Sequence, residues 1–596
     1  MEELKNRKEI DPKLTWDLSL LYRDEKEWEK DLASLDGLLK AFLEYKGRLA
    51  DSPETLCKAY EASDALFQMA EKVYVYASLK NDEDTTLGAS QSNLARIREK
   101  YTSIGAQCSW FSPELLAMEE EKFLSFLDSP ILAFYKRSLL EENRYRPHLL
   151  SEKEERILSM ASEVLGSPGT IFRSFNDADL RFPGIKTEEG NVEVTHGNYI
   201  TLLQSKERSV RKKAFTAMHG TYHKFRHTLA STYSSNTKKN ILSARLRSWD
   251  SALEASLFGD NVPKEVYDNL IRDVREGISS LHKYLALRKK VLKLSKLHMY
   301  DLYTPLLPER EEKVSWEEAV KWVKSSLSVM GEEYGKIVEK AFAQRWMDVP
   351  ESRGKRSGAY SGGCYGCPPY MLLNFHENLS GAFTLAHELG HSIHSYYSDH
   401  AQKFHYASYR IFVAEVASTT NELLLHNYLM KNARNDHIRL ALLNQLMEEI
   451  RGTLFRQTMF AEFEKNSHAA AESGTPLTAD TLEKIYGDLN SFYFSPVVQD
   501  ELIRSEWSRI PHFYSSFYVY KYATGISAAC ALSRKILKGE VESYLDFLRA
   551  GSSKDVLDIL KDAGVDFING TPVKEALAFF DETLDEFEKI WKKTRN

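Results

Sequence analysis

The sequence predicts a mainly α-helical protein with a small amount of β-structure. Apolar residues recur at spacings of three and four over much of the chain, as one face of a helix requires. Pairs such as Ser112-Pro113 and Ser129-Pro130 separate these periodic segments, at places where helices are expected to end. With 596 residues, the chain has room for several helical layers around large cores.

The elements follow in a clear order. The first 170 or so residues are expected to form antiparallel helices, with periodic segments at residues 16–43, 59–80, 94–109, 114–127 and 152–165, and a helix end at Ser167-Pro168-Gly169. Residues 179–196 predict a short hairpin, residues 206–296 predict long helices, and residues 300–305 predict a brief strand. We therefore expect an N-terminal helical lobe at residues 1–185 and a second region at residues 186–596.

Composition and charge exclude several classes of protein. The chain has 79 Lys and Arg against 86 Asp and Glu, a net charge of −7, and the two signs are interspersed. This pattern argues against nucleic acid or an anionic membrane as the main partner. No apolar run approaches the roughly 20 residues of a membrane span, and the charged N-terminus does not resemble a signal peptide. Five scattered cysteines do not form a disulfide framework, so we expect a cytoplasmic protein, of open oligomeric state.

Residues 354–375 interrupt the helical pattern with five glycines, a Pro-Pro pair and an apolar run. Such a stretch suits a strand edge that pairs with an extended peptide, although packed glycine turns without a ligand would look the same. The candidate substrate-binding residues here are Gly362, Gly363, Tyr370 and Asn374. Cys364 and Cys367 form a single Cys-x-x-Cys pair, which fits either two reduced thiols or a redox switch.

The candidate metal-binding and catalytic residues begin in the segment at residues 380–397. Ser380 is expected to cap a helix whose apolar stripe is Phe383, Ala386, Leu389 and Ile393. His387 and His391 lie four residues apart, so they stack on one helix face and can reach one metal ion at the roughly 2 Å Zn–N distance. Glu388 beside them can accept a proton from metal-bound water. This is the H-E-x-x-H arrangement of metallopeptidases.

A third ligand is expected from Glu415. It is the only charge in the apolar helical run Ile411-Phe-Val-Ala-Glu-Val-Ala, and a buried carboxylate needs a cation. The alternatives are that Glu415 faces solvent or pairs with Lys or Arg. His394 competes for the third position, but three ligands in line on one helix form a poor tetrahedral site, so it is expected near the cleft. Glu422 could orient one of the histidines.

The run His387-Glu-Leu-Gly-His391, followed 24 residues later by Glu415-Val-Ala-Ser-Thr, resembles the thimet oligopeptidase superfamily. Three further stretches, over nearly the whole chain, are similar to its oligoendopeptidase F branch. They are Ser361-Gly-Gly with Pro369-Tyr-Met-Leu-Leu-Asn374, the opening Thr15-Trp-Asp-Leu-Ser, and Phe517-Tyr-Val-Tyr-Lys-Tyr-Ala-Thr-Gly525.

The resemblance implies a two-lobed, zincin-like metallopeptidase with a deep central channel and a small β-sheet at the edge of the active site. It implies one Zn²⁺ per chain on His387, His391 and Glu415, with Glu388 as the general base and an active-site core at about residues 350–530. Its substrates would be short oligopeptides cut at internal bonds. It also implies a histidine and tyrosines over the scissile carbonyl, which we assign to His512, Tyr514 and Tyr520, with Tyr518 in reserve. Each tyrosine could equally belong to an aromatic core.

Three other functions stay open from the residues alone. A di-iron oxidase would need Glu-x-x-His on two helices, but the second copy, Glu193 to His196, falls in the predicted hairpin. A non-catalytic helical protein that binds peptides would keep its fold without metal. An exopeptidase would differ from an endopeptidase in failing to cut peptides with blocked ends.

Overall fold

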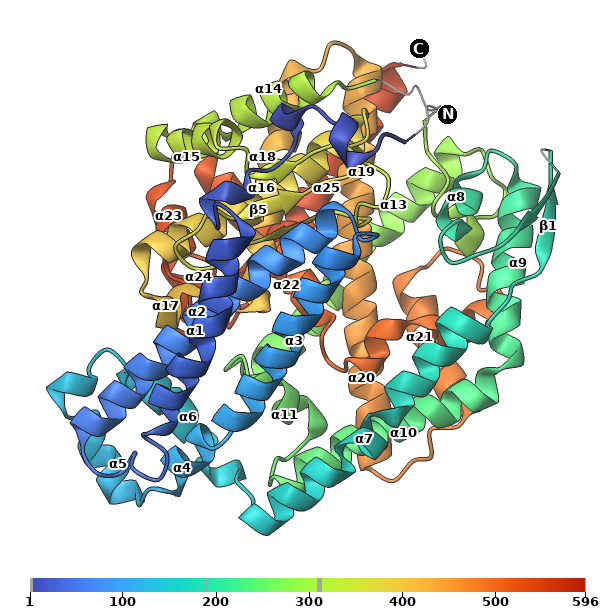
Figure 1. Cartoon of the computed structure of the whole chain (residues 1–596). Coiled ribbons are helices and arrows are strands. Elements are labelled where there is room, and N and C mark those ends of the chain that lie inside the picture. The colour runs from blue at the N-terminus through green and yellow to red at the C-terminus, as the bar shows by residue number, and fades with distance from the viewer. Residues whose placement is uncertain (1–3, 189, 308–312, 595–596) are drawn as a thin grey trace. The chain divides into compact units, whose positions relative to one another are not determined.

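The computed structural model describes residues 4–188, 190–307 and 313–594, and it is mainly helical (Figure 1). Its contacts group the chain into two compact units, each built from separate stretches of sequence. The first unit comprises Met1–Pro147, Glu311–Tyr428 and Leu532–Gly564, and the second comprises His148–Arg310, Leu429–Ala531 and Val565–Asn596. The division of the sequence into residues 1–185 and 186–596 stays a prediction.

The first unit contains most of the helices before residue 147 and those around the histidine motif. Its helices are α1 (Glu25–Leu43), α2 (Pro53–Glu83), α3 (Gly88–Cys108), α4 (Phe111–Ala117), α5 (Glu120–Leu127), α6 (Lys136–Asn143), α14 (Trp316–Leu327), α15 (Glu332–Ala343), α16 (Leu379–Ala401), α17 (Phe404–Ala407), α23 (Glu542–Arg549) and α24 (Val556–Asp562). A three-stranded sheet has the order β3-β5-β4, formed by β3 (Met347–Asp348), β4 (Tyr360–Gly362) and β5 (Tyr370–Leu372).

The second unit contains the long middle helices and the C-terminal helix. They are α7 (Glu152–Arg173), α8 (Tyr199–Gln204), α9 (Arg208–Lys224), α10 (Arg226–Leu246), α11 (Ala252–Phe258), α12 (Lys264–Glu276), α13 (Ile278–Val291), α19 (Asp436–Ile450), α20 (Arg456–Glu472), α21 (Ala479–Tyr493) and α25 (Thr571–Lys593). Strands β1 (Gly184–Thr187) and β2 (Gly190–Glu193) form the antiparallel hairpin that the sequence predicts. Helices α18 (Ile411–Asn432) and α22 (Tyr520–Ile536) run where the chain passes from one unit to the other.

Helix α1 shows how apolar periodicity builds the core of the first unit. Asp24 caps the helix by accepting from the backbone N–H groups of Lys26 and Glu27, so the helix begins at Glu25 and not at residue 16. Its buried stripe is Trp28, Leu32, Leu35, Leu39 and Phe42. These residues share one apolar core with α2, α3 and side chains of β5. The sheet that lies beside the histidine motif is thereby fixed to three long helices.

Two sequence-based expectations are wrong for identifiable reasons. Helix α7 continues through Pro168 to Arg173, because the hydroxyl of Ser167 donates to the Val164 carbonyl (2.7 Å) that the proline nitrogen leaves without its usual donor. Residues 299–301 form the 3-10 helix η7 (Met299–Asp301) and not a strand. Its end is held by Asp301, which is fully buried and ion-paired with Arg211 (2.9 Å).

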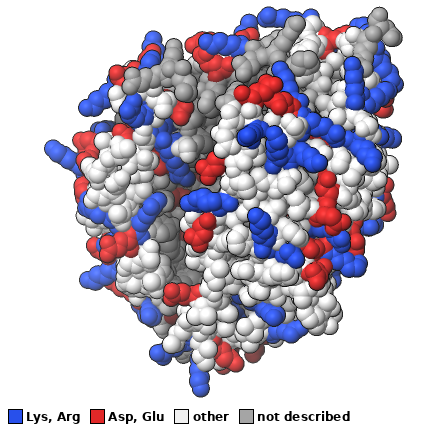
Figure 2. All heavy atoms as spheres, turned by 90° about the vertical axis from the view of Figure 1, so that its right-hand side faces the viewer, with Lys and Arg blue, Asp and Glu red and all other residues white. Residues whose placement is uncertain are grey.

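Charges are dispersed over the visible surface. On the face shown in Figure 2, Lys and Arg lie among Asp and Glu. In the described part of the chain, every helix is too short or too polar to serve as a membrane span.

Candidate metal centre

Helix α16 carries the histidine motif, and it begins two residues earlier than predicted. Asn378 caps it by accepting from the Gly381 N–H (3.0 Å), whereas Ser380 lies inside the first turn. The predicted apolar stripe is confirmed, since Phe383, Ala386, Leu389 and Ile393 are at most 6% exposed. Burial of this stripe fixes the rotation of α16, so the two histidines lie together on another face.

The side chains of His387, His391 and Glu415 converge. The two Nε2 atoms lie 3.2 Å apart, and Oε2 of Glu415 lies 3.4 Å from Nε2 of His387 and 3.6 Å from Nε2 of His391. Two Zn–ligand bonds of about 2 Å at a tetrahedral angle separate their ligand atoms by about 3.3 Å. The three separations therefore fit one zinc ion. Within the described residues, this is the group of His, Cys, Asp and Glu side chains close enough to hold a metal.

Glu415 reaches the histidines from α18 because the two helices approach very closely. A Cβ at Gly390 would lie 2.6 Å from the Cα of Ser418 and 2.9 Å from the Ala417 carbonyl oxygen. The contact is reinforced by Asn421 of α18, which donates to the Ala386 carbonyl (3.3 Å) and accepts from the buried Tyr334 hydroxyl (3.0 Å). The glycine within the motif thus allows a carboxylate from a second helix to complete the ligand set.

Two carboxylates, Glu415 and Glu422, determine the electrostatics around the histidines. Burial lowers the pKa of His387, but Glu415 and Glu422 outweigh burial and raise it to about 10. Hydrogen bonds from His387 and His391 hold the pKa of Glu415 well below its usual range. Oε2 of Glu422 lies 3.3 Å from Nδ1 of His387, which places it to orient that imidazole from behind. These contacts favour a cation between the three ligand groups.

Glu388 and His394 occupy different surroundings. Glu388 is 7% exposed, and burial raises the pKa of its carboxyl despite the two neighbouring imidazoles. His394 is 1% exposed and stacks on Tyr409, with ring centroids 3.7 Å apart. Burial lowers the pKa of His394 to about 3. It thus lies close to the cluster without belonging to it, as expected.

The apolar run that the sequence suggested as an edge forms the central strand β5, and β3 and β4 are the two edge strands of the sheet. Tyr370 lies in the central strand β5, fully buried, and its hydroxyl donates to the Asp17 carbonyl (2.9 Å). Asn374 donates to the carbonyls of Arg356 and Gly358, so it holds the loop before β4. Gly362 ends the edge strand, which the Ser361 hydroxyl ties to Ser392 of α16 (2.8 Å).

The next residues form a tight turn. A Cβ at Gly363 would lie 3.0 Å from the Pro369 Cα, so this glycine is closely packed. The N–H of Cys367 donates to the Cys364 carbonyl (3.1 Å), and both cysteines are free thiols.

The predicted histidine and tyrosines belong to the second unit, in η11 (Pro511–Tyr514) and the segment that leads into α22. The rings of Tyr518 and Tyr522 surround His512, with centroids 6.4 and 5.8 Å from its imidazole. Tyr514 stacks on Phe172 (4.3 Å), and Tyr520 is 1% exposed against Tyr267 (5.1 Å). The sequence favoured Tyr514 and Tyr520 over Tyr518, but the spacing of the tyrosines does not show which of them are exposed.

The buried acid Glu464 holds the segment that leads into α22. Phe517 has a left-handed backbone (φ 62°), and its N–H donates to Oε1 of the fully buried Glu464 (2.9 Å). Burial raises the pKa of Glu464 well above its usual range. Glu464 therefore anchors the turn that precedes α22.

Comparison with known proteins gives consistent matches over the whole chain. The description "Peptidase family M3" matches residues 201–579, and "Oligopeptidase F" matches residues 114–182. The chain is 45% identical to oligopeptidase PepF of Bacillus subtilis, covering 100% of this chain and 89% of that protein. It is 41% identical to an oligoendopeptidase F homolog of Lactococcus lactis, covering 99% of each.

Comparison with solved structures agrees with these sequence matches. The crystal structure of oligoendopeptidase-F from Enterococcus faecium is 36% identical, with a TM-score of 0.73, and covers 96% of this chain and 99% of that one. A structure from Chlamydophila abortus, also 36% identical, aligns with a TM-score of 0.93 over 99% of this chain and 100% of that one.

Proposed function

The chain belongs to peptidase family M3, and from this premise we propose that it is a zinc endopeptidase that hydrolyses internal bonds of short, unstructured oligopeptides. The observation that carries the proposal is the convergence of His387, His391 and Glu415 at the separations of a tetrahedral zinc site. Family membership supports a metal-dependent peptidase, and the donor set supports zinc. One ion per chain and a cytoplasmic location belong to the same proposal.

The residues of the chain have distinct roles in the proposed reaction. When bound, zinc polarises the scissile carbonyl and lowers the pKa of a coordinated water toward about 7. Glu388, adjacent to the first ligand, takes the proton of the attacking water and passes it to the leaving amine. Glu422 keeps the His387 ring in position by holding its Nδ1 atom.

Substrate would be positioned by backbone pairing. The edge strand β4, which ends at Gly362, would pair with an extended peptide, and such pairing selects little between side chains. Gly363 keeps the following turn close to Pro369. Asn374 acts by holding the loop before β4, and Tyr370 acts as a support inside the sheet.

Donors to the carbonyl oxygen are proposed from the segment around His512. The candidate tyrosines are Tyr514, Tyr518 and Tyr520. The half-buried position of Tyr518 beside His512 favours Tyr518, whereas Tyr520 is almost fully buried. A donor that acts only in the transition state is worth roughly 10²–10³ in rate.

The deciding experiment combines metal analysis with product analysis. Purified protein should contain one equivalent of zinc and cut an internally quenched peptide that is blocked at both ends. Chelation should abolish cleavage, and zinc should restore it. An exopeptidase would leave the blocked peptide intact, and a non-catalytic peptide-binding protein would bind the peptide without cutting it.

A further inference from the structure

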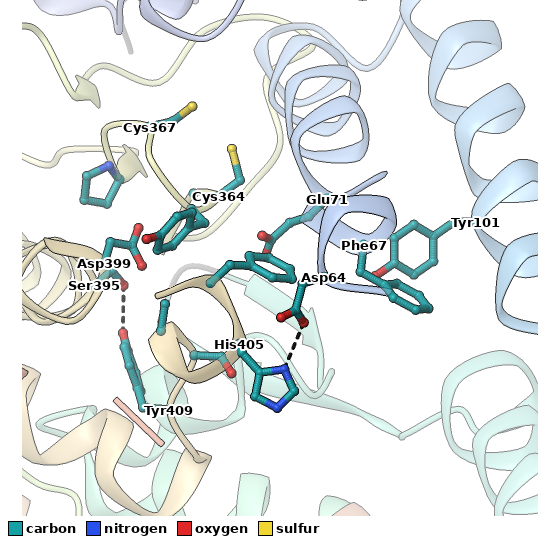
Figure 3. A pocket seen from close by; sticks show the side chains of 16 residues that line it. Asp64, Phe67, Glu71, Tyr101, Cys364, Cys367, Ser395, Asp399, His405 and Tyr409 are labelled. Atoms are coloured by element: carbon teal, nitrogen blue, oxygen red, sulfur yellow. Dashed lines mark hydrogen bonds and ion pairs between the residues drawn. The ribbon is translucent and has the colours of Figure 1, made fainter. Parts of the chain in front are cut away.

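A cavity of about 350 Å³ lies in the first unit next to helix α16 (Figure 3). Its walls come from α2, from α16, from the turn after β4 and from residues 404–409. Five of the lining side chains are aromatic: Phe67, Tyr101, Tyr365, Phe404 and Tyr409. Three carboxylates also line it, but no lysine or arginine is found among the described lining residues. Its volume falls in the usual range for small-ligand sites.

One of the three carboxylates, Asp64, already has hydrogen-bond partners within the protein. Asp64 accepts from Nδ1 of His405 (2.8 Å) and from the Tyr135 hydroxyl (3.1 Å), and the other His405 nitrogen contacts the Ser138 hydroxyl (2.6 Å). His405 is therefore fully engaged with groups of the protein. It does not serve the two remaining acids.

Glu71 and Asp399 have no such partner. Figure 3 shows Glu71 on α2 and Asp399 on α16, on different walls of the cavity. In the described part of the chain, neither forms an ion pair with lysine or arginine. Burial raises the pKa of Glu71, which a backbone N–H of Tyr365 offsets only in part, and burial together with Glu71 raises the pKa of Asp399 to about 7. The cavity thus carries two acids that a cation would stabilise in their charged forms.

The arrangement of the acids in the cavity favours an organic cation over a small metal ion. A small metal ion needs at least three ligand atoms close together, and among the described residues this arrangement occurs at His387, His391 and Glu415 only. An ammonium or guanidinium group can instead span separate carboxylates and lie against aromatic faces. The ring pairs Phe67–Tyr101 (6.4 Å) and Tyr365–Phe404 (5.8 Å) supply such faces.

The distance between the cavity and the candidate metal centre matches the length of a short peptide. Asp399 follows His391 by two helical turns on α16, which corresponds to about 12 Å along the helix axis. An extended peptide advances about 3.3 Å per residue. The span is therefore three to four substrate residues, a length that fits an oligopeptide.

We propose that this cavity is a subsite that binds a cationic group of the substrate, held by Glu71 and Asp399 between aromatic side chains. The inference rests on the proposed peptidase function and adds a substrate class to it. The cation is either a lysine or arginine side chain three to four residues from the scissile bond, or the free N-terminus of a peptide of matching length.

The test uses quenched peptides in which one lysine replaces norleucine at each position in turn, with free and with acetylated N-termini. We expect kcat/KM to rise roughly ten-fold for lysine at one position three to four residues from the cut, mainly through KM. In Glu71→Gln/Asp399→Asn the ratio of kcat/KM for lysine over norleucine should fall toward one. Glu120→Gln, an exposed acid on α5, should keep the wild-type ratio.

The results of the experiment distinguish a lysine side chain from a free N-terminus as the source of the cation. They also distinguish failure of the proposed subsite from failure of the proposed peptidase function. A rate gain lost on acetylation, and absent for internal lysine, would assign the cavity to the N-terminus. The absence of both a lysine preference and an effect of acetylation, or a preference that survives in the double variant, would overturn the subsite while leaving the peptidase intact. Failure of the wild-type enzyme to cut any peptide would instead overturn the proposed function. Asp399→Lys supplies an independent check, because it should reverse the preference toward glutamate.

Discussion

Gly390 and Ser418 are in direct backbone contact: a Cβ at position 390 would lie 2.6 Å from the Ser418 Cα. Gly390→Ala must therefore push α18 away from α16 and draw Glu415 away from the two histidines. We expect the variant to lose zinc affinity by at least ten-fold and to melt at a lower temperature. Zinc content after dialysis against a buffered chelator, together with thermal unfolding, measures both effects.

The matched control is Gly335→Ala. This glycine is also helical, in α15 of the same unit, but nothing lies within 4 Å of its missing Cβ. Alanine should stabilise that helix by up to about 1 kcal/mol and leave metal binding unchanged. Equal zinc affinity in both alanine variants would show that the close approach does not position Glu415.

Glu388→Gln tests the general base. The substitution keeps the shape of the side chain but removes its capacity to accept a proton, so kcat should fall by roughly 10²–10⁴ while zinc remains bound. Steady-state kinetics with parallel metal analysis separates these effects. A variant that retains full turnover would remove Glu388 from this role.

Glu415→Ala tests the third ligand. Loss of a carboxylate that contacts both imidazoles should lower zinc affinity by an order of magnitude or more. The comparison is His394→Gln, which should keep its metal because His394 stacks on Tyr409 outside the cluster. The opposite pattern, with metal kept in the first variant and lost in the second, would assign the third position to His394.

Tyr518→Phe and Tyr520→Phe rank the proposed oxygen donors. We expect Tyr518→Phe to lower kcat much more than it changes KM, because its ring lies beside His512 at a half-buried position. Tyr520→Phe should change kcat less, since Tyr520 is 1% exposed against Tyr267. A larger kcat loss in the Tyr520 variant would restore the assignment made from sequence.

The sequence was sufficient to predict most of the helices and the grouping of His387, His391 and Glu415, because the helices and the spacing of the two histidines follow local patterns. Apolar spacing determines which face of α16 is buried, and the four-residue spacing of His387 and His391 then fixes their relative position. Glu415 was identified as the one charge in an apolar run, and in the structure its side chain is not buried but 42% exposed beside the two histidines. Glu422, which was expected to orient one of the two histidines, lies 3.3 Å from Nδ1 of His387.

Other features depend on contacts between distant residues, and no local pattern encodes them. The run at Tyr370 is the central strand because β3 and β4 pair with β5 on its two sides, and its apolar sequence does not reveal this arrangement. Glu71 and Asp399 meet only because α2 and α16 line one cavity. The helix through Pro168 persists because of a single Ser167 hydroxyl, which the breaker pattern hides.

Glu464→Gln should make the protein less sensitive to rising pH. The pKa of Glu464 is higher in the folded chain than its ordinary value of 4.5, because the carboxyl is buried, so the folded state holds a proton that the unfolded state releases. Its contribution to stability is complete below pH 4.5 and is lost as pH rises toward the folded pKa. Gln keeps an acceptor for the Phe517 N–H but has no proton to lose. We therefore expect the melting temperature of the variant to exceed that of the wild type by a margin that grows from pH 5 to pH 8. Glu265→Gln, an exposed acid on α12, should follow the wild-type curve, and parallel curves for all three proteins would contradict the assignment of a buried neutral acid.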